Sequence, residues 1–253
     1  SIKLEIRKTI NKNIMIRIAF VINFNPNAWL GGYNVIKNLI WSIYLNKPQN
    51  IKIVLFVNKD IPNQFFKKLP AEIIKTNFFK NFKLINRILT RLEILILGKS
   101  KIYDNFFLKH KIDFVSHFNP LGRKSKINSF CWIPDFQEIH YPKYFTIRQL
   151  ILRRINLFYN IFNSTKIILS SNTVKKDLKK IIKVDDDKLF IHQFYFKNYP
   201  LSKIMKFKAL YKKFKIKKNY FFLPNQYWPH KNHMLVLKAI HYLLNKKKIS
   251  LNI

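Results

Sequence analysis

The feature that most constrains the fold is a run of apolar, largely β-branched residues over Met15–Asn23, MIRIAFVIN. A run of this kind, without polar alternation, is typical of a parallel strand covered on both faces. Gly31 and Gly32 follow, and apolar residues then recur at helical spacing, at Val35, Ile36, Leu39, Ile40 and Ile43. Ile51–Val57 predicts a second strand. Together these segments indicate a strand–helix–strand unit, and therefore an α/β protein with a parallel sheet.

The same alternation continues along the 253 residues. Further strands are predicted at Asp113–Ser116, Ser129–Ile133, Lys166–Leu169, Leu189–His192, Tyr220–Leu223 and Ile249–Ile253. Helical patterns cover Asn63–Leu69, Phe79–Leu97, Thr146–Phe162, a segment after Ser171, the Lys-rich Tyr199–Lys218 and a last segment around Val236–Leu244. We expect a Rossmann-like domain over residues 15–200. Over residues 201–253 we expect a crossover and the beginning of a second Rossmann-like domain, with its C-terminal part missing from the chain.

The formal net charge of +36 would suit nucleic acid, anionic lipid or a polyanionic substrate. The basic residues are scattered and accompany many Ile, Asn and Phe residues, as an AT-rich coding sequence would produce, so the charge is weak evidence for one partner. The single cysteine, Cys131, excludes an intrachain disulfide and fits a reducing compartment. We find no signal-peptide pattern or membrane span, which predicts a cytoplasmic protein, soluble or peripheral.

A polar loop follows the predicted strand at Ser129–Ile133. The stretch Cys131–Tyr144, CWIPDFQEIHYPKY, holds Asp135, Gln137, Glu138 and His140 between two prolines. Open α/β sheets bind their ligands in loops at the carboxyl ends of the strands. This loop is therefore either the floor of a substrate cleft or an ordinary polar connection.

Three other strand ends carry polar or flexible residues. Gly31 and Gly32 would let backbone amides at a helix N-terminus face an anion, or would form a plain tight turn. Ser171 and Asn172 are good N-cap residues, and capping accounts for them, although such a cap can also bind a ligand hydroxyl or phosphate. His117 is either structural or a binding contact. No second ligand stands at metal spacing from it, so we expect no metal site.

The helix predicted at Phe79–Leu97 is amphipathic and basic. Its apolar stripe consists of Phe82, Ile85, Leu89, Leu92 and Ile96, and its cations are Lys80, Lys83, Arg87 and Arg91. Such a helix can lie on an anionic membrane surface. Alternatively, it packs its apolar stripe on the core and exposes its basic face.

Four segments in order resemble the retaining, family-4 type of GT-B glycosyltransferases: strand–GG–helix, WIPDFQEIHYPKYF, LSSNTVKKDL and FFLPNQYWPHKNH. The resemblance extends from Met15 to the end of the chain. It implies two Rossmann-like domains facing a cleft, with the acceptor on the N-terminal domain and a nucleotide-diphospho-sugar donor mostly on the C-terminal one. It also implies catalysis without a metal or any cofactor beyond the donor substrate.

Carried over residue by residue, the resemblance places Gly31 and Gly32 near the donor diphosphate. It places Asn225, Gln226 and Lys231 in the donor-binding segment, where an ammonium would neutralise the departing diphosphate. The remaining assignments are Asp135 and His140 as catalytic residues, and His117, Gln137, Ser171 and Asn172 on the acceptor side of the cleft. The chain departs from the pattern in three ways: Gln226 stands at the usual arginine, Pro134 stands at the usual histidine, and the Glu-x7-Glu motif would lie beyond Ile253.

The leading hypothesis is a metal-independent, hexosyltransferase-type enzyme of polysaccharide biosynthesis that transfers sugar, with retention, to a glycan or lipid-linked acceptor. The helix at Phe79–Leu97 would hold it peripherally on the inner membrane face. The fragment itself is expected to be inactive. One alternative is a basic nucleic-acid-binding protein. The scattered charges and the lack of a recognition motif argue against it. The other is a non-catalytic GT-B relative, suggested by Gln226 and Pro134.

Overall fold

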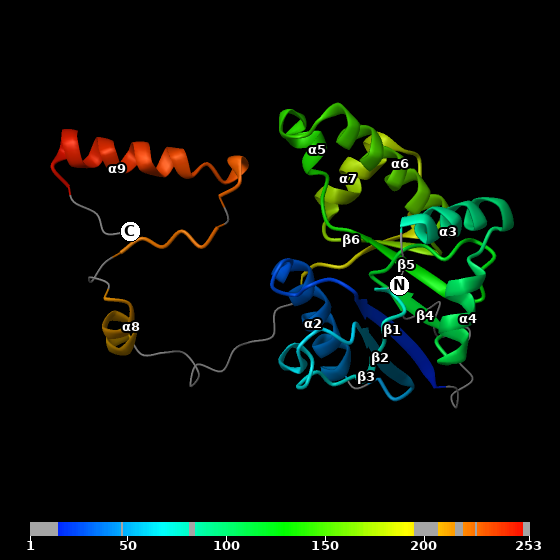
Figure 1. The fold of residues 1–253 in the computed structure, drawn as a ribbon. Coiled ribbons are helices and arrows are strands. Elements are labelled where there is room, and N and C mark those ends of the chain that lie inside the picture. The colour runs from blue at the N-terminus through cyan, green and yellow to red at the C-terminus, as the bar shows by residue number, and fades with distance from the viewer. Residues whose placement is uncertain are drawn as a thin grey trace. The chain divides into compact units, whose positions relative to one another are not determined.

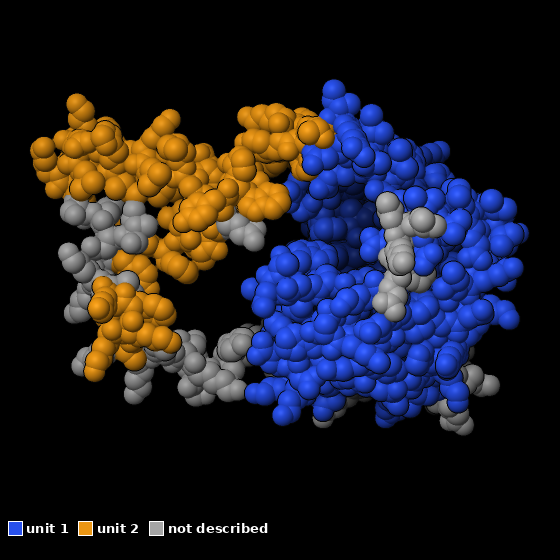
Figure 2. Space-filling model, viewed as in Figure 1, with its two compact units in different colours: residues 1–137, 147–197 blue, residues 138–146, 198–253 orange. Residues whose placement is uncertain are grey.

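The computed structural model describes residues 15–46, 48–80, 84–194, 207–215, 220–225 and 227–249. The chain forms two compact units (Figure 2), a larger one of residues 1–137 and 147–197 and a smaller one of residues 138–146 and 198–253. The predicted domain boundary between residues 200 and 201 stays a prediction.

A seven-stranded sheet forms the centre of the larger unit, in the order β3-β2-β1-β4-β5-β6-β7 (Figure 1). All six strand pairs are parallel. The strands are β1 (Ile16–Ile22), β2 (Ile51–Val57), β3 (Glu72–Lys75), β4 (Phe114–Ser116), β5 (Asn128–Ile133), β6 (Lys166–Leu169) and β7 (Leu189–Ile191). The predicted α/β class with a parallel sheet is confirmed. The order reverses between β1 and β4, which makes the sheet doubly wound.

The nearly continuous apolar run of β1 has a direct cause, because both faces of the sheet are covered. Ala19 and Val21 face one hydrophobic cluster, which also holds Phe107 of α4 (Lys101–Lys109). Phe20 and Ile22 face the other cluster, which α2 (Leu30–Leu45) covers. From Ile18 to Ile22 no position is left to a polar residue, as expected for a parallel strand between two helical layers, and Arg17 at the start of the strand is the exception.

The other helices of the larger unit are α3 (Leu84–Leu97), α6 (Ile147–Asn163) and α7 (Asn172–Ile181), and α5 (Gln137–His140) extends from it into the smaller unit. Short 3₁₀ segments lie at η1 (Asn63–Phe65), η2 (Pro142–Tyr144) and η3 (Asp186–Lys188). The Ser171 hydroxyl accepts a hydrogen bond from the Val174 amide at 3.2 Å, which confirms the predicted cap of α7.

Two expectations for these segments were wrong. The helix predicted at Asn63–Leu69 is only the 3₁₀ turn η1, since the chain lies between a buried strand and the short β3. The stretch Cys131–Tyr144 is less of a loop than its composition indicates, because β5 extends to Ile133 and α5 and η2 each contribute one turn.

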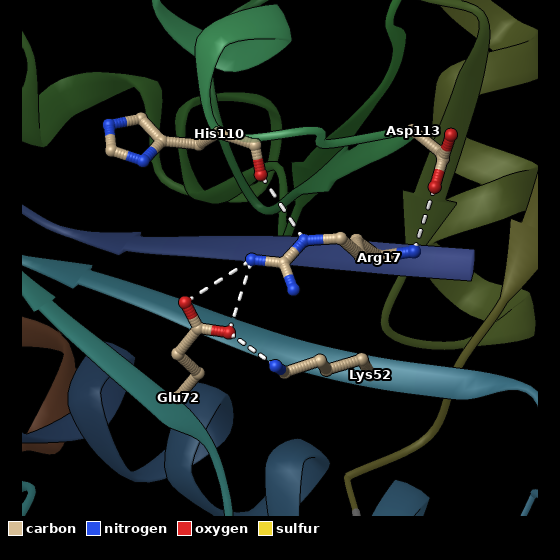
Figure 3. Close-up of polar contacts among 5 residues, drawn as sticks. All are labelled: Arg17, Lys52, Glu72, His110 and Asp113. Atoms are coloured by element: carbon tan, nitrogen blue, oxygen red, sulfur yellow. Dashed lines mark hydrogen bonds and ion pairs between the residues drawn. The ribbon is translucent and has the colours of Figure 1, made fainter. Parts of the chain in front are cut away.

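The amino edge of the sheet is tied together by ion pairs (Figure 3). The Arg17 guanidinium on β1 contacts the Glu72 carboxylate on β3 at 3.1 Å, and the Lys52 ammonium on β2 contacts the same carboxylate at 2.8 Å. Arg17 also donates a hydrogen bond to the carbonyl of His110 at 3.2 Å, and its amide donates to the Asp113 carboxylate at 2.8 Å. The hydrogen bond from Lys52, with the charge of Arg17, lowers the pKa of Glu72. This cluster holds the first three strands in register.

In the smaller unit the described elements are α8 (Phe207–Phe214), the 3₁₀ turn η5 (Pro229–Lys231) and α9 (His233–Lys247). The helix expected within Tyr199–Lys218 is α8. Lys215 follows it, and the other residues of that range, 199–206 and 216–218, lie outside the described part of the chain. The strand predicted at Tyr220–Leu223 is wrong: Tyr220 forms an isolated bridge, and no neighbouring strand among the described residues pairs with Phe221–Leu223. Of the strand predicted at Ile249–Ile253, residues 250–253 lie outside the described part.

Candidate binding site at the carboxyl edge of the sheet

A polar residue or a proline stands directly after each of the seven strands, with Asn58 after β2 and Thr76 after β3. Asn23, His117, Pro134, Ser170 and His192 follow β1, β4, β5, β6 and β7. Because the strands are parallel, these residues share one edge of the sheet, opposite the Arg17–Glu72 cluster. The point where strand order reverses, here between β1 and β4, is where doubly wound sheets bind ligands. Three cavities lie along this edge, and the surface of the larger unit is hollowed beside α2 (Figure 2).

The first of these, the α2 cavity, has a volume of about 390 Å³ and lies between the start of α2 and the loops after β5 and β7. It is the place where three predicted site residues meet, because Gly31, Gly32 and Asp135 all line it. Its polar lining also includes Asn34 and Asn38 of α2 and His192, none of which the sequence analysis selected.

The start of α2 has unused hydrogen-bond donors. The helix begins at Leu30, so Gly31 and Gly32 belong to its first turn and not to the preceding loop. No side chain of the described residues caps this end. The amides of the first turn have no carbonyl partner within a helix and are suited to bind an anion. A Cβ atom at Gly32 would lie 2.5 Å from the Trp29 ring, so Gly32 lets this indole pack on the helix.

Asp135 is exposed in the α2 cavity and is held by its neighbours. Its carboxylate accepts a hydrogen bond from the Gln137 amide group at 3.0 Å. The Ser170 hydroxyl donates to the carbonyl of Pro134, which ties the loop after β5 to the end of β6. The predicted Asp135 and Gln137 therefore act together: the amide fixes the direction of the carboxylate.

The neighbouring His117 cavity has a volume of about 240 Å³ and shares Trp29 and Trp132 with the α2 cavity. His117 has left-handed backbone angles (φ 57°), and its Nδ1 lies 2.9 Å from the Ser116 hydroxyl. The residue as a whole is half-buried, but the Nε2 atom of its ring is buried and has no hydrogen-bond partner among the described residues. Burial, with a smaller effect from His192, lowers the pKa of His117 to about 3, so the imidazole is neutral at physiological pH.

Aromatic rings form the boundary between these two cavities. The indoles of Trp29 and Trp132 stack with centroids 6.2 Å apart, and His117 lies 5.2 Å from Trp132. Cys131 lies behind them, and its thiol donates a hydrogen bond to the carbonyl of Phe118 at 3.1 Å. Burial raises the pKa of Cys131 to about 11, which makes it a packing residue and not a nucleophile.

The third cavity, here named the arginine cavity, has a volume of about 370 Å³ and shares Asn23 and Asn119 with the His117 cavity. Arg87 and Arg91 of α3 line it. The packing of α3 expected from its apolar stripe is therefore wrong, as Leu89, Leu92 and Ile96 are exposed and Thr90 and Ile94 are buried. The helical spacing in α6 predicts an inward face of Ile147, Leu150, Ile151, Ile155, Phe158 and Ile161, and this prediction is partly wrong. Ile147, Ile151 and Ile155 are exposed, and the buried residues are Leu157 and Ile161.

The remaining predicted site residues lie elsewhere. Ser171 and Asn172 do not line the three cavities, and Ser171 serves as the cap of α7. His140, exposed at the end of α5, does not line them either, and it belongs to the smaller unit together with Asn225 and Lys231. Gln226 lies outside the described residues.

Among the described residues no group of three His, Cys, Asp or Glu side chains could hold a metal ion. Within the same residues no helix has both the length and the apolar content to cross a bilayer.

Fold and cavities together define a doubly wound α/β protein with a candidate ligand site at its topological switch point. No protein-family model and no curated protein sequence matches the chain. Two similar solved structures are UDP-N-acetylglucosamine 2-epimerases. The one from Listeria monocytogenes, an epimerase by assignment, has 9% identity and a TM-score of 0.43, covering 70% of this chain and 44% of that one. The one from Methanocaldococcus jannaschii has 13% identity and a TM-score of 0.41, covering 70% and 45%. The chain thus spans less than half of either structure, and its family stays unassigned.

Proposed function

We propose that the chain carries the acceptor side of a retaining glycosyltransferase, which transfers a sugar from a nucleotide-diphospho-sugar to a glycan or lipid-linked acceptor. The observation that carries the proposal is the α2 cavity, where the uncapped first turn of α2 at Gly31 and Gly32 meets the carboxylate of Asp135. The cavity thus combines donors for a diphosphate with a carboxylate for an acceptor hydroxyl. This combination suits glycosyl transfer.

The chemistry follows from these groups. As the sugar–phosphate bond breaks, negative charge builds on the departing diphosphate, and the amides at the start of α2 stabilise it. Asp135 accepts the proton of the acceptor hydroxyl that takes the sugar, with Gln137 keeping its carboxylate in place. The Trp29 and Trp132 indoles offer flat apolar faces on which a sugar ring or a nucleobase stacks. The proposal also assigns Asn225, Gln226 and Lys231 to the donor, with Lys231 neutralising the diphosphate, and His140 to catalysis.

The proposal includes contact with an anionic membrane surface through α3. Leu89, Leu92 and Ile96 are 56%, 47% and 77% exposed. Exposed leucines and isoleucines on one helix face are a feature of interfacial helices. Binding to vesicles of anionic lipid, lost on replacing these three residues by serine, is the expected result.

Isothermal titration of the protein with UDP, GDP and their sugar conjugates tests the function. We expect saturable binding of one nucleotide class, weakened at least tenfold in Gly31→Pro, which alters the first turn of α2. In the full-length protein, turnover assays with radiolabelled donor should show loss of transfer in Lys231→Ala and a large decrease in Asp135→Asn, each with an unchanged melting temperature.

The outcomes separate the alternatives. Nucleotide-sugar binding without transfer to any acceptor would support a non-catalytic relative. Absence of nucleotide binding, together with a steeply salt-dependent affinity for DNA or RNA, would replace the proposal with nucleic-acid binding. Normal turnover in Lys231→Ala would remove that residue from the mechanism.

A further inference from the structure

Helix α3 presents its charged and apolar faces in an unusual way. Arg87, Thr90, Arg91 and Ile94 follow the i, i+3, i+4, i+7 spacing of a single helix face, and all four line the arginine cavity. The opposite side, with Leu89, Leu92 and Ile96, is exposed. A soluble amphipathic helix normally buries its apolar face and exposes its cations. Here Arg87 and Arg91 are exposed as well, but both line a cavity that has no carboxylate among its described lining residues, and such a cavity is suited to bind an anion.

Every polar side chain that lines the cavity can donate a hydrogen bond. Beside the two arginines stand Tyr103 and Tyr159, and no carboxylate is among the described residues that line it. The Arg91 guanidinium lies 5.1 Å from the centre of the Tyr159 ring, which fixes its direction. Burial raises the pKa of Tyr159 to about 12 and also raises that of Tyr103, so both phenols keep their protons at neutral pH.

A buried hydroxyl marks the same place. Thr90 is 4% exposed, and its Oγ1 has no hydrogen-bond partner among the described residues. A buried polar atom without a partner is costly, and such atoms in native proteins usually meet a water, an ion or a ligand. Neither Arg87 nor Arg91 forms an ion pair with a described carboxylate. The cavity therefore holds two unpaired cations and an unsatisfied hydroxyl.

We propose that the arginine cavity binds a phosphoryl group, held by Arg87, Arg91 and the Thr90 hydroxyl, and that this group belongs to the acceptor substrate. Arginine matches the geometry of phosphate with paired N–H donors. Asn23 and Asn119 line both this cavity and the His117 cavity, so the part of the acceptor next to the phosphoryl group extends toward the switch point. The assignment to an acceptor rests on the proposed function. Phosphoryl binding itself does not.

The test is isothermal titration in the absence of nucleotide, with inorganic phosphate and hexyl phosphate as probes and hexanol as the uncharged reference. Arg87→Gln and Arg91→Gln should each weaken binding of hexyl phosphate at least tenfold. Thr90→Val, which keeps the shape of the side chain, should weaken binding about threefold or more without lowering the melting temperature. Arg123→Gln is the matched control, since Arg123 is exposed in the loop before β5, at the opposite edge of the sheet. This variant should bind hexyl phosphate as the wild type does.

The two sources of phosphate give different results. A hexyl phosphate affinity at least tenfold above that of inorganic phosphate identifies an amphiphilic acceptor. Equal affinities identify a soluble phosphorylated acceptor. Wild-type affinity in the double variant Arg87→Gln/Arg91→Gln, or an equal loss in Arg123→Gln, would overturn the inference, because the binding would then reflect net charge alone.

The failure of this inference and that of the proposed function are distinguishable. Phosphate probes that bind in the arginine cavity of a protein without nucleotide affinity would contradict the glycosyltransferase and leave the phosphoryl site standing. Nucleotide binding with no response to the phosphate probes would do the reverse.

Discussion

The buried imidazole of His117 makes the stability of the protein depend on pH in a defined window. Its pKa is lowered from 6.5 to about 3 in the folded protein. Below pH 6.5 the unfolded chain binds a proton that the folded protein does not, so the free energy of unfolding falls as the pH falls. The loss is about 1.4 kcal/mol per pH unit and ends near the folded pKa. Between pH 7 and pH 5 this amounts to about 2 kcal/mol.

The variant His117→Asn isolates this effect. Asparagine tolerates the left-handed backbone (φ 57°) of this position and does not titrate. Urea unfolding followed by far-ultraviolet circular dichroism at pH 7, 6 and 5, at constant ionic strength, gives the stability of both proteins. We expect the variant to lose about 2 kcal/mol less than the wild type over this range. His110 and His192, whose pKa values are also lowered, contribute to both proteins and largely cancel in the difference.

The exposed His241→Asn is the control and should keep the wild-type slope. The imidazole of His117 can also be observed directly by nitrogen-15 NMR, where it should stay neutral down to pH 4. Parallel stability curves for the wild type and His117→Asn, or a titration of this imidazole near pH 6.5, would refute the reasoning.

Three further predictions test other parts of the structure. Gly32→Ala should destabilise the protein and weaken nucleotide binding, because the new Cβ would lie 2.5 Å from the Trp29 ring. Gly31→Ala is the comparison, since a Cβ at that position has no atom within 4 Å. In thermal melts this variant should be neutral or more stable by up to about 1 kcal/mol. Glu72→Gln should cost about 1 kcal/mol of stability at pH 7, because a carboxylate with a lowered pKa stabilises above pH 4.5 and loses this effect as the pH falls. Its control is Asp60→Asn at an exposed pair with Lys80, and equal stabilities of the two variants would show that the strand cluster contributes nothing. Cys131 should resist alkylation by iodoacetamide in the native protein, and rapid modification at pH 8 would contradict its burial.

Much of the fold was predictable because long parallel strands occur in the sequence as nearly continuous runs of apolar residues. Met15–Asn23 and Ile51–Val57 differ from β1 and β2 by no more than one residue at each end. The strand β3 was not predicted, since Glu72–Lys75 is short, begins and ends with a charge and lies at the sheet edge. The helix α4 was also missed, because its nine residues include two lysines and an aspartate between the apolar ones.

Sequence reasoning located part of the site for a physical reason and missed the rest for another. Loops at the ends of parallel strands converge on one edge, so Gly31, Asp135 and His117 could be expected there. The roles of Trp132 and His192 depend on which strands are neighbours, and periodicity does not contain that information. For α3, periodicity identified two faces correctly but could not say which one the protein covers. The site therefore follows from strand order more than from any motif.

The stacked indoles of Trp29 and Trp132 have a consequence for spectroscopy. Their centroids are 6.2 Å apart and their planes differ by 24°. Two chromophores held this close couple their electronic transitions, and the resulting exciton couplet in the circular dichroism spectrum depends on the angle between them. Any molecule that enters either adjoining cavity and rotates one ring changes the sign or the amplitude of that couplet. The protein thus carries an optical reporter of occupancy at its own binding edge, which needs no added label.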